Sequence, residues 1–375
     1  MQVLLESEFV PEAGPVPLGI VGCSLARPRL GAAVALSQHL QVVAMADPDT
    51  RFAKAWSRTL SGDIALFADL QSLLTHDTVP PALILEVPLS ERSEALLAAI
   101  PLCRGIMCAP PFAATLEETD RILHAAAAHN TLLMPVFPRR FDPVILYAIE
   151  YANSGEIGLL QQLRCDWSFP LSRAYGAEIG ADPDAGGWDS LLLYAGCHAA
   201  DVCRWCLGDV LTVSADIDTH TPMEAHGGRR DTSPLLANLV LGMENGPATC
   251  HFTRSRAVHP AERYTFTGSL GNLEVVVSST TNAASAFPML TVHRQGIRPH
   301  PVASPEFAGS ELPAQVYRMK ALLDEFARLV QNRVTEMEKG DDSRPALEVV
   351  HAAQLSAHEC RKITLPLRHS PIFPF

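Results

Sequence analysis

Tyr194 and His198 stand four residues apart in the segment GGWDSLLLYAGCHAADV, a spacing that places both side chains on one face of a helix. An imidazole titrates near neutral pH, so His198 could act as a general acid or base. A tyrosine hydroxyl on the same face could hold or pass the proton. The alternative is a structural histidine, packed in the helix with its hydrogen bonds satisfied. We take Tyr194 and His198 as the candidate catalytic residues.

Two charged residues complete this candidate site. Arg140, in the tract PVFPRRFDP, could pair with an anionic or polar group of a substrate, because a guanidinium presents a planar fork of donors. Asp201 follows His198 in the same segment and is the second candidate substrate-binding residue. The alternative for Arg140 is a salt bridge between two domains.

A candidate dinucleotide site lies in LGIVGCSLARPRL, where an apolar run ends at Gly22. A strand that turns into a helix there would offer backbone N–H groups to a pyrophosphate. The three glycine positions of the G-x-G-x-x-G fingerprint fall on Gly22, Ser24 and Arg27, so only the first is glycine. The candidate cofactor-binding residues of this turn are Gly22, Cys23, Ser24 and Leu25.

Asp47 ends the second apolar run, QVVAMA, at the distance of roughly 20 to 25 residues from Gly22 that the dinucleotide fingerprint requires. A carboxylate at that place accepts hydrogen bonds from a ribose 2′-hydroxyl and repels a 2′-phosphate. We therefore expect NAD in preference to NADP if a cofactor binds. The alternative is that Asp47 and Pro48 cap the following helix and that no cofactor is used.

Nine cysteines are scattered along the chain, from Cys23 to Cys360, and their number is odd. This distribution is typical of reduced, mostly buried thiols in a cytoplasmic protein. Cys203 and Cys206 have the C-x-x-C spacing but lack a second pair. His198 with the nearby cysteines has no zinc-ligand spacing, so we expect no metal site.

Composition limits the class of partner. The 375 residues are 47% hydrophobic and 19% charged, which suits a globular protein of two domains. The net charge of -12 repels phosphate backbones and anionic lipid surfaces, so nucleic acid and membrane are not expected partners. No apolar run approaches the length of about 18 residues that a membrane span needs.

The first predicted domain covers residues 1–138. Short apolar runs such as PLGIVG, QVVAMA, ALILEV, GIMCA and TLLMPV alternate with helical stretches, among them residues 29–38, 90–99 and 115–128. Such alternation predicts a doubly wound, Rossmann-like parallel sheet with helices on both faces.

The second predicted domain covers residues 139–375. From about Gly158 the apolar runs, such as LLQQLRCDWSF and RYTFTGS, read as strands separated by turns, which predicts an α/β domain with a large, mainly antiparallel open sheet. Its last long helix is expected at residues 313–333, where an apolar stripe indicates core packing. The members of that stripe are Val316, Met319, Leu322, Leu323, Phe326 and Leu329.

Phrases along nearly the whole chain resemble the glucose-fructose oxidoreductase and inositol dehydrogenase (Gfo/Idh/MocA) family: MADPD, PVFPRRFDP, SGEIGLLQQLR, GCHAADV, GSLGNLEV and HAAQLSAHECRKITLP. The resemblance implies a Rossmann domain followed by a domain whose open sheet makes homo-oligomer contacts. It also implies oxidation or reduction of a small sugar or polyol with bound NAD(P).

The resemblance also shows departures at the active site. Where the family has Glu-Lys-Pro, this chain has Ala109, Pro110 and Pro111, so the lysine thought to act beside the nicotinamide is absent. No lysine occurs between Lys54 and Lys320 that could replace it.

Two further family positions differ. The Thr-Pro pair that precedes a histidine corresponds to Val87 and Pro88, which we retain as cofactor-binding candidates, and Arg92 stands near the histidine's place. Tyr194 stands where the family has an aspartate. Two functions follow: a divergent NAD-dependent oxidoreductase in which His198 and Tyr194 handle the proton, or the same fold kept for a non-redox enzyme or a silent binding protein.

Overall fold

The computed structural model describes residues 14–24, 28–170, 188–218, 236–255, 261–278, 289–302, 314–333 and 342–371. These residues fall into two compact units. The first unit takes its residues from Met1–Ala109, Arg121–Val136 and Met319–Gly340, and the second from Pro110–Asp120, Phe137–Arg318 and Asp341–Phe375.

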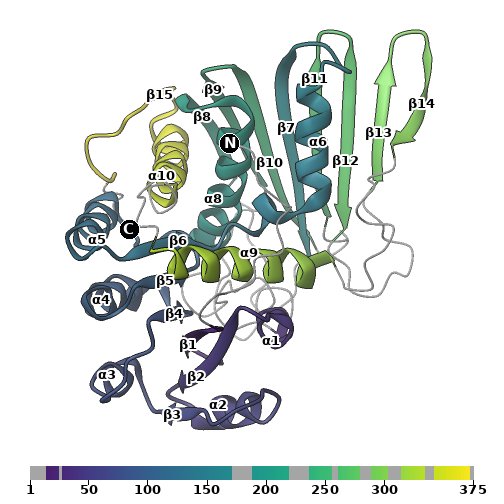
Figure 1. The fold of residues 1–375 in the computed structure, drawn as a ribbon. Coiled ribbons are helices and arrows are strands. Elements are labelled where there is room, and N and C mark those ends of the chain that lie inside the picture. The colour runs from purple at the N-terminus through teal and green to yellow at the C-terminus, as the bar shows by residue number, and fades with distance from the viewer. Residues whose placement is uncertain are drawn as a thin grey trace. The chain divides into compact units, whose positions relative to one another are not determined.

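The first unit contains a parallel sheet of six described strands, in the order β3-β2-β1-β4-β5-β6 (Figure 1). All neighbouring strands run parallel. Every residue of β4, β5 and β6 is buried, as expected for a sheet covered on both faces. The strands are β1 (Val16–Val21), β2 (Leu40–Ala46), β3 (Ala65–Phe67), β4 (Ala82–Leu85), β5 (Gly105–Cys108) and β6 (Leu132–Pro135).

Helices alternate with these strands, which confirms the predicted Rossmann-like order. Pro28 begins α1, a position where proline's missing N–H costs no hydrogen bond. The unit boundaries fall inside α5 and α9. The helices are α1 (Pro28–Leu36), α2 (Thr50–Ser57), α3 (Leu70–Leu74), α4 (Leu89–Ala99), α5 (Leu116–His129) and α9 (Ala314–Gln331), with a 3₁₀ turn at Ile100–Leu102.

The predicted apolar stripe of α9 is confirmed at five of its six positions in the described structure. Met319 is half-buried instead, and the other five side chains are buried. Phe326 and Val330 lie against Gly105 of β5, where an added Cβ would stand 2.5 Å from Val330 Cγ2. The glycine therefore lets this helix approach the sheet closely.

The second unit contains a sheet of nine described strands, in the order β14-β13-β12-β11-β7-β10-β9-β8-β15 (Figure 1). Among these strands, β7 and β10 form the one parallel pair and the other pairs are antiparallel, which confirms the predicted sheet. The strands are β7 (Leu160–Pro170), β8 (Val210–Asp218), β9 (Leu236–Met243), β10 (Gly246–Ser255), β11 (Ala261–Gly268), β12 (Gly271–Ser278), β13 (Met289–Arg294), β14 (Ile297–Val302) and β15 (Ile363–Thr364).

Three helices of the second unit pack against its sheet or against one another: α6 (Pro143–Asn153), α8 (Trp188–Leu207) and α10 (Ser343–Glu359). A 3₁₀ turn at Pro138–Phe141 precedes α6. Gly196 of α8 lies against Val350 of α10, because a Cβ on this glycine would be 2.6 Å from Val350 Cγ2. The prediction that residues 313–333 form the last long helix is wrong, since α10 follows. The buried face of α10 includes Glu348 and His351, and these two residues interrupt the apolar periodicity by which a helix is predicted from sequence.

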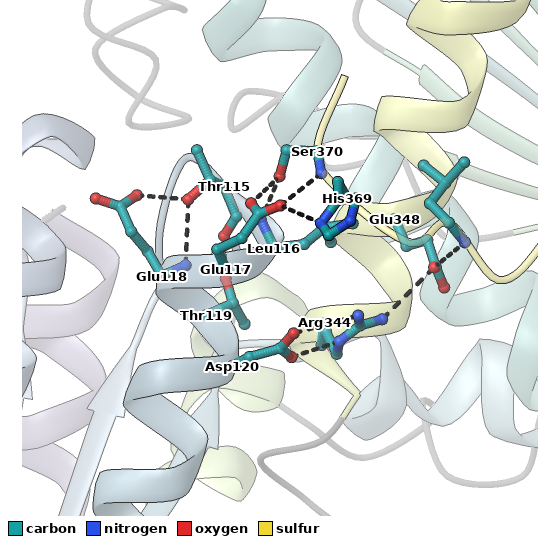
Figure 2. Close-up of polar contacts among 11 residues, drawn as sticks. Thr115, Leu116, Glu117, Glu118, Thr119, Asp120, Arg344, Glu348, His369 and Ser370 are labelled. Atoms are coloured by element: carbon teal, nitrogen blue, oxygen red, sulfur yellow. Dashed lines mark hydrogen bonds and ion pairs between the residues drawn. The ribbon is translucent and has the colours of Figure 1, made fainter. Parts of the chain in front are cut away.

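A segment after β15 is fastened to the first turn of α5 (Figure 2). The N–H of Leu116 donates to Ser370 Oγ at 2.7 Å, and the N–H of Ser370 donates to Glu117 Oε1 at 2.9 Å. The N–H of Leu367 donates to Glu348 Oε1 at 2.7 Å. Hydrogen bonds from Ser370 lower the pKa of Glu117 to about 2. Two stretches far apart in sequence are thus joined by specific polar contacts.

Candidate functional site

Gly22 forms the turn at the carboxyl end of β1. Its φ is +85°, a conformation that favours glycine, and its N–H donates to the carbonyl of Ala46 at 2.9 Å. An added Cβ would stand 1.7 Å from the carbonyl oxygen of Glu86. No other residue fits here without moving the backbone, so the first fingerprint position has a strict steric cause.

Asp47 lies directly after β2 and reaches back to this turn. Its Oδ2 accepts the N–H of Ser24 at 2.6 Å, and its Oδ1 accepts the N–H of Asp49 at 2.8 Å. The residue is 1% exposed. The alternative that Asp47 caps the next helix is wrong, because Asp49 is the N-cap of α2 and accepts the N–H of Arg51. Asp47 instead joins two loops at the carboxyl edge of the sheet.

Of the two remaining candidate residues in this turn, the structure describes Cys23 but not Leu25. Cys23 is buried, and its thiol points toward the carbonyls of Ile20 and Ala46 at 4.0 and 3.9 Å. Burial and the nearby Asp47 raise the pKa of Cys23 to about 12, so it is a neutral thiol at physiological pH. Leu25 lies outside the described residues.

Arg92 of α4 links the segments that follow β4 and β5. Its Nη2 donates to the carbonyl of Val87 at 3.1 Å, and its Nη1 donates to the carbonyl of Ala109 at 3.2 Å. Burial raises the pKa of the adjacent Cys108 to about 12, although the Arg92 charge opposes the rise. Pro88 stands directly before α4, as its first flanking residue. The edge that lacks a lysine therefore carries the half-buried guanidinium of Arg92. The sequence resemblance puts Arg92 only near the position of the family's histidine.

Tyr194 and His198 lie together on α8, as the four-residue spacing predicts. Their ring centroids are 4.5 Å apart in an edge-to-face arrangement, and the ring of Phe137 lies 5.4 Å from His198. His198 is 3% exposed, and Tyr194 is half-buried. The imidazole therefore sits in an aromatic environment within the second unit. Contact with a substrate requires its surroundings to open.

Arg140 and Asp201 bind each other. Arg140 Nε and Nη2 donate to Asp201 Oδ1 at 3.0 and 2.5 Å, and Arg140 Nη1 lies 2.8 Å from Asp342 Oδ2. Asp201 is 1% exposed, and the Arg140 guanidinium balances the charge of its carboxylate in the interior. The alternative of an inter-domain salt bridge is wrong, because all three residues belong to the second unit. Both candidate substrate-binding residues are thus occupied by structural ion pairs.

The neighbouring Arg139 also lies beside Tyr194, although the sequence pattern does not mark it as a site residue. It forms a two-pronged salt bridge with Glu262, and its guanidinium carbon lies 4.3 Å above the ring of Trp167 and 5.9 Å from that of Tyr194. Arg139 is 4% exposed. The basic tract PRRF therefore supplies buried ion pairs, and that of Arg139 lies beside Tyr194. In the sequence, the two adjacent arginines are the only sign of these ion pairs.

The first unit fits a bound dinucleotide on structural grounds. Gly22 takes a positive φ that lets the chain turn directly at the end of β1, and each carboxylate oxygen of Asp47 can accept a further hydrogen bond besides the backbone one that it already accepts. Both features lie at the carboxyl ends of β1 and β2, where doubly wound sheets bind nucleotides. Three sulfurs of the second unit form a separate group.

Comparison with known families gives two matches. A model of the oxidoreductase family described as an NAD-binding Rossmann fold matches residues 16–137. A model of the GFO/IDH/MocA C-terminal domain matches residues 145–274.

Individual relatives are more distant. Inositol 2-dehydrogenase of Burkholderia multivorans is 27% identical over 195 residues, which are 51% of this chain and 54% of that protein. D-xylose 1-dehydrogenase (NADP(+)) 2 of Haloferax volcanii is 27% identical over 176 residues, or 47% and 52% of the two chains. The chain thus spans about half the length of these curated relatives.

Among solved structures, an oxidoreductase from Agrobacterium radiobacter in complex with NAD+, L-tartaric acid and magnesium has a TM-score of 0.74 at 17% identity, covering 93% of this chain and 98% of that one. At this identity the likeness shows a common fold. Within the described residues, no helix has both the length and the apolar composition needed to cross a lipid bilayer.

Proposed function

Since the chain belongs to the GFO/IDH/MocA family of oxidoreductases, with an NAD(P)-binding Rossmann domain, we propose that it transfers a hydride between NAD(H) and a sugar, polyol or similar small hydroxyl or carbonyl compound. The observation that carries the proposal is the turn at Gly22 and the hydrogen bond from the Ser24 N–H to Asp47, both at the carboxyl edge of the parallel sheet. The domain division at residues 138 and 139 remains our prediction and accompanies this assignment.

The cofactor site uses residues of the first unit. Gly22, Cys23, Ser24 and Leu25 would hold the pyrophosphate, and Asp47 would accept the ribose hydroxyls. Its carboxylate repels a 2′-phosphate, which supports NAD over NADP. When bound, the nicotinamide supplies or accepts the hydride.

Val87 and Pro88 would lie at the nicotinamide end of the same edge. Arg92 holds the carbonyls of Val87 and Ala109 in place, so it fixes the backbone there. An arginine does not give up its proton at neutral pH, and its role is therefore to position and to supply positive charge.

We assign the removal of the substrate's hydroxyl proton to His198. Hydride transfer from an alcohol carbon leaves a hydroxyl proton to be removed, and imidazole can take it near neutral pH. Tyr194 packs on the imidazole ring and orients it. Arg140 binds Asp201 of this same helix, so we assign to the pair a role in shaping the substrate pocket in place of direct charge pairing with the substrate.

Localisation and assembly complete the proposal. We place the protein in the cytoplasm as a homo-oligomer that pairs through the open sheet of the second unit. Its strands β8 and β9 carry exposed apolar side chains, Leu211, Leu236 and Val240, of which Val240 is 52% exposed. Apolar groups on a sheet face favour burial against a second copy.

One experiment tests the proposed function. The purified chain is titrated with NADH while nicotinamide fluorescence is followed, and a panel of sugars and polyols is then assayed with NAD. We expect saturable NADH binding in the micromolar range and turnover with at least one compound. Absence of binding at millimolar NADH would contradict the proposal. Binding without any turnover would favour a protein that keeps the cofactor only as structure.

A further inference from the structure

Three cysteines from three separate elements meet inside the second unit. Cys165 of β7 and Cys250 of β10 are direct partners across the parallel strand pair, so their side chains lie side by side on one face of the sheet. Cys203 of α8 lies over them. Its sulfur is 3.8 Å from the sulfur of Cys165 and 3.8 Å from that of Cys250. All three sulfurs lie within 4.8 Å of one another.

This triangle has the size of a three-sulfur coordination site. A trivalent metalloid carries a lone pair and is pyramidal, so three bonds to sulfur of about 2.3 Å place the sulfurs at a mutual distance of about 3.5 Å. The two 3.8 Å separations exceed that distance by a few tenths of an ångström, so the three sulfurs need only draw slightly together around the ion. Plain packing of thiols gives similar distances, so geometry permits a site and the surroundings must select its occupant.

The group offers three ligands and no fourth. No histidine, aspartate, glutamate or further cysteine joins it among the residues that the structure describes. Cys206, which shares the C-x-x-C spacing with Cys203, is outside the group. Structural zinc takes four ligands, so this arrangement suits an ion that is satisfied by three sulfurs.

The dry environment favours a complex without charge. The exposed fractions of Cys165, Cys203 and Cys250 are at most 1%. Tyr264, the register partner of Cys165 on β11, is equally buried. A net charge buried in such a place is costly. Three thiolates around Cu(I) or Zn(II) leave a negative charge, whereas three thiolates around a trivalent metalloid leave none.

We propose that Cys165, Cys203 and Cys250 form a binding site for one trivalent thiophilic metalloid. Arsenite is the compound of this class that serves as the probe. Arsenous acid is uncharged at neutral pH and carries three hydroxyl groups on the metalloid. Three arsenic–oxygen bonds break and three arsenic–sulfur bonds form. Each hydroxyl leaves as water with the proton of one thiol, and arsenic remains trivalent. The reaction needs no oxidant or reductant.

The test uses the whole reduced chain and arsenite at a one-to-one ratio. Native mass spectrometry should show one added arsenic atom less three protons. The thiols that react after unfolding should fall from nine to six per chain. An unchanged mass, or loss of two thiols in place of three, would overturn the proposal. Parallel titrations with Cu(I) and Zn(II) should give weaker binding, and tighter Cu(I) binding would overturn the assignment to a metalloid.

Variants locate the site. Cys203→Ser should lose the adduct, as should Cys165→Ala and Cys250→Ala tested separately in case one of them fails to fold. Cys206→Ser, one turn further along the same helix, should keep it, as should Cys360→Ser at an exposed position. Loss of the adduct in Cys206→Ser would move the site to the C-x-x-C pair and refute the three-element cluster.

Discussion

The backbone N–H of Ser24 donates to Oδ2 of Asp47 at 2.6 Å, which ties the turn after β1 to the end of β2. The carboxylate proposed to bind ribose therefore also shapes the loop proposed to bind pyrophosphate. Substitutions of Asp47 must be interpreted with both roles in view, and the contrast between two cofactors separates them.

Asp47→Asn should weaken NADH binding by about tenfold, equivalent to about 1.4 kcal/mol, because a charged acceptor is lost. NADPH binding should change less or improve, since repulsion of the 2′-phosphate is relieved. Fluorescence titration of both cofactors measures this. Asp49→Asn, which alters the N-cap of α2 but not the Ser24 contact, is the control. Tighter binding of NADPH than NADH by the unsubstituted protein would contradict the assignment of NAD.

Gly22→Ala should destabilise the first unit severely, because the new Cβ would stand 1.7 Å from the carbonyl oxygen of Glu86. Gly14→Ala is a matched control. Gly14 also has a positive φ, +78°, but an added Cβ meets nothing within 4 Å. The control should lose only about 1 kcal/mol from backbone strain. Thermal unfolding of both variants measures the difference, and equal losses would mean that the turn relaxes around the clash.

Arg92→Gln should lower turnover by about tenfold to a hundredfold, because the carbonyls of Val87 and Ala109 lose the cation that holds them. Arg92→Lys should recover only part of the loss, since one ammonium cannot span both acceptors in a fork. Steady-state kinetics with separate kcat and KM values, alongside NADH affinity, measure the effect. Arg58→Gln on the exposed end of α2 is the control. Full activity in Arg92→Gln would remove the residue from the positioning role.

His198→Asn should reduce turnover by about a hundredfold to ten-thousandfold while NADH affinity is retained. Tyr194→Phe keeps the edge-to-face ring contact and loses the hydroxyl. If Tyr194 only orients the imidazole, this variant should keep most of the activity. If the Tyr194 hydroxyl passes the proton, Tyr194→Phe should lose activity and the pH profile of turnover should shift. Turnover that survives in His198→Asn would show that another group carries the proton.

His351 should make the second unit sensitive to acid. Burial lowers the pKa of His351 from 6.5 to about 4, so the folded state favours the neutral imidazole. Its contribution is complete above about pH 6.5 and is lost as the pH falls toward 4, which amounts to about 3 kcal/mol at most. Denaturant unfolding across that range should show the decline. His351→Gln should flatten it, whereas His300→Gln on exposed β14 should not.

Local patterns predicted much of the fold because apolar strand runs and helical periodicity are properties of short stretches of sequence. The apolar runs mark β1, β2, β4, β5 and β6, and Asp47 lies where the second run ends. Helix α10 is hard to predict from its sequence, because the charged or polar residues Glu348 and His351 are buried on its apolar face. The hairpin of β13 and β14 leaves no apolar pattern in the sequence of β14, because that strand is largely exposed and does not alternate between buried and exposed residues.

The site was harder to predict because its contacts depend on strand register and on long side chains. Spacing placed Tyr194 beside His198, since both lie on one helix. It could not show that Arg140 binds Asp201, or that Arg92 reaches the carbonyl of Ala109. Nor could it join Cys165 to Cys250, which become neighbours only through the pairing of β7 with β10.

The hydrogen bond from the Leu116 N–H to Ser370 spans 254 residues of sequence. A ribosome that adds about 5 to 20 residues per second needs roughly 10 to 50 seconds to supply the second partner after the first. Throughout that interval the N–H of Leu116 lacks its seryl acceptor, while Thr115 Oγ1 of the same turn can already accept the N–H of Glu118. Until Ser370 emerges, the N–H of Leu116 must therefore find water or another acceptor.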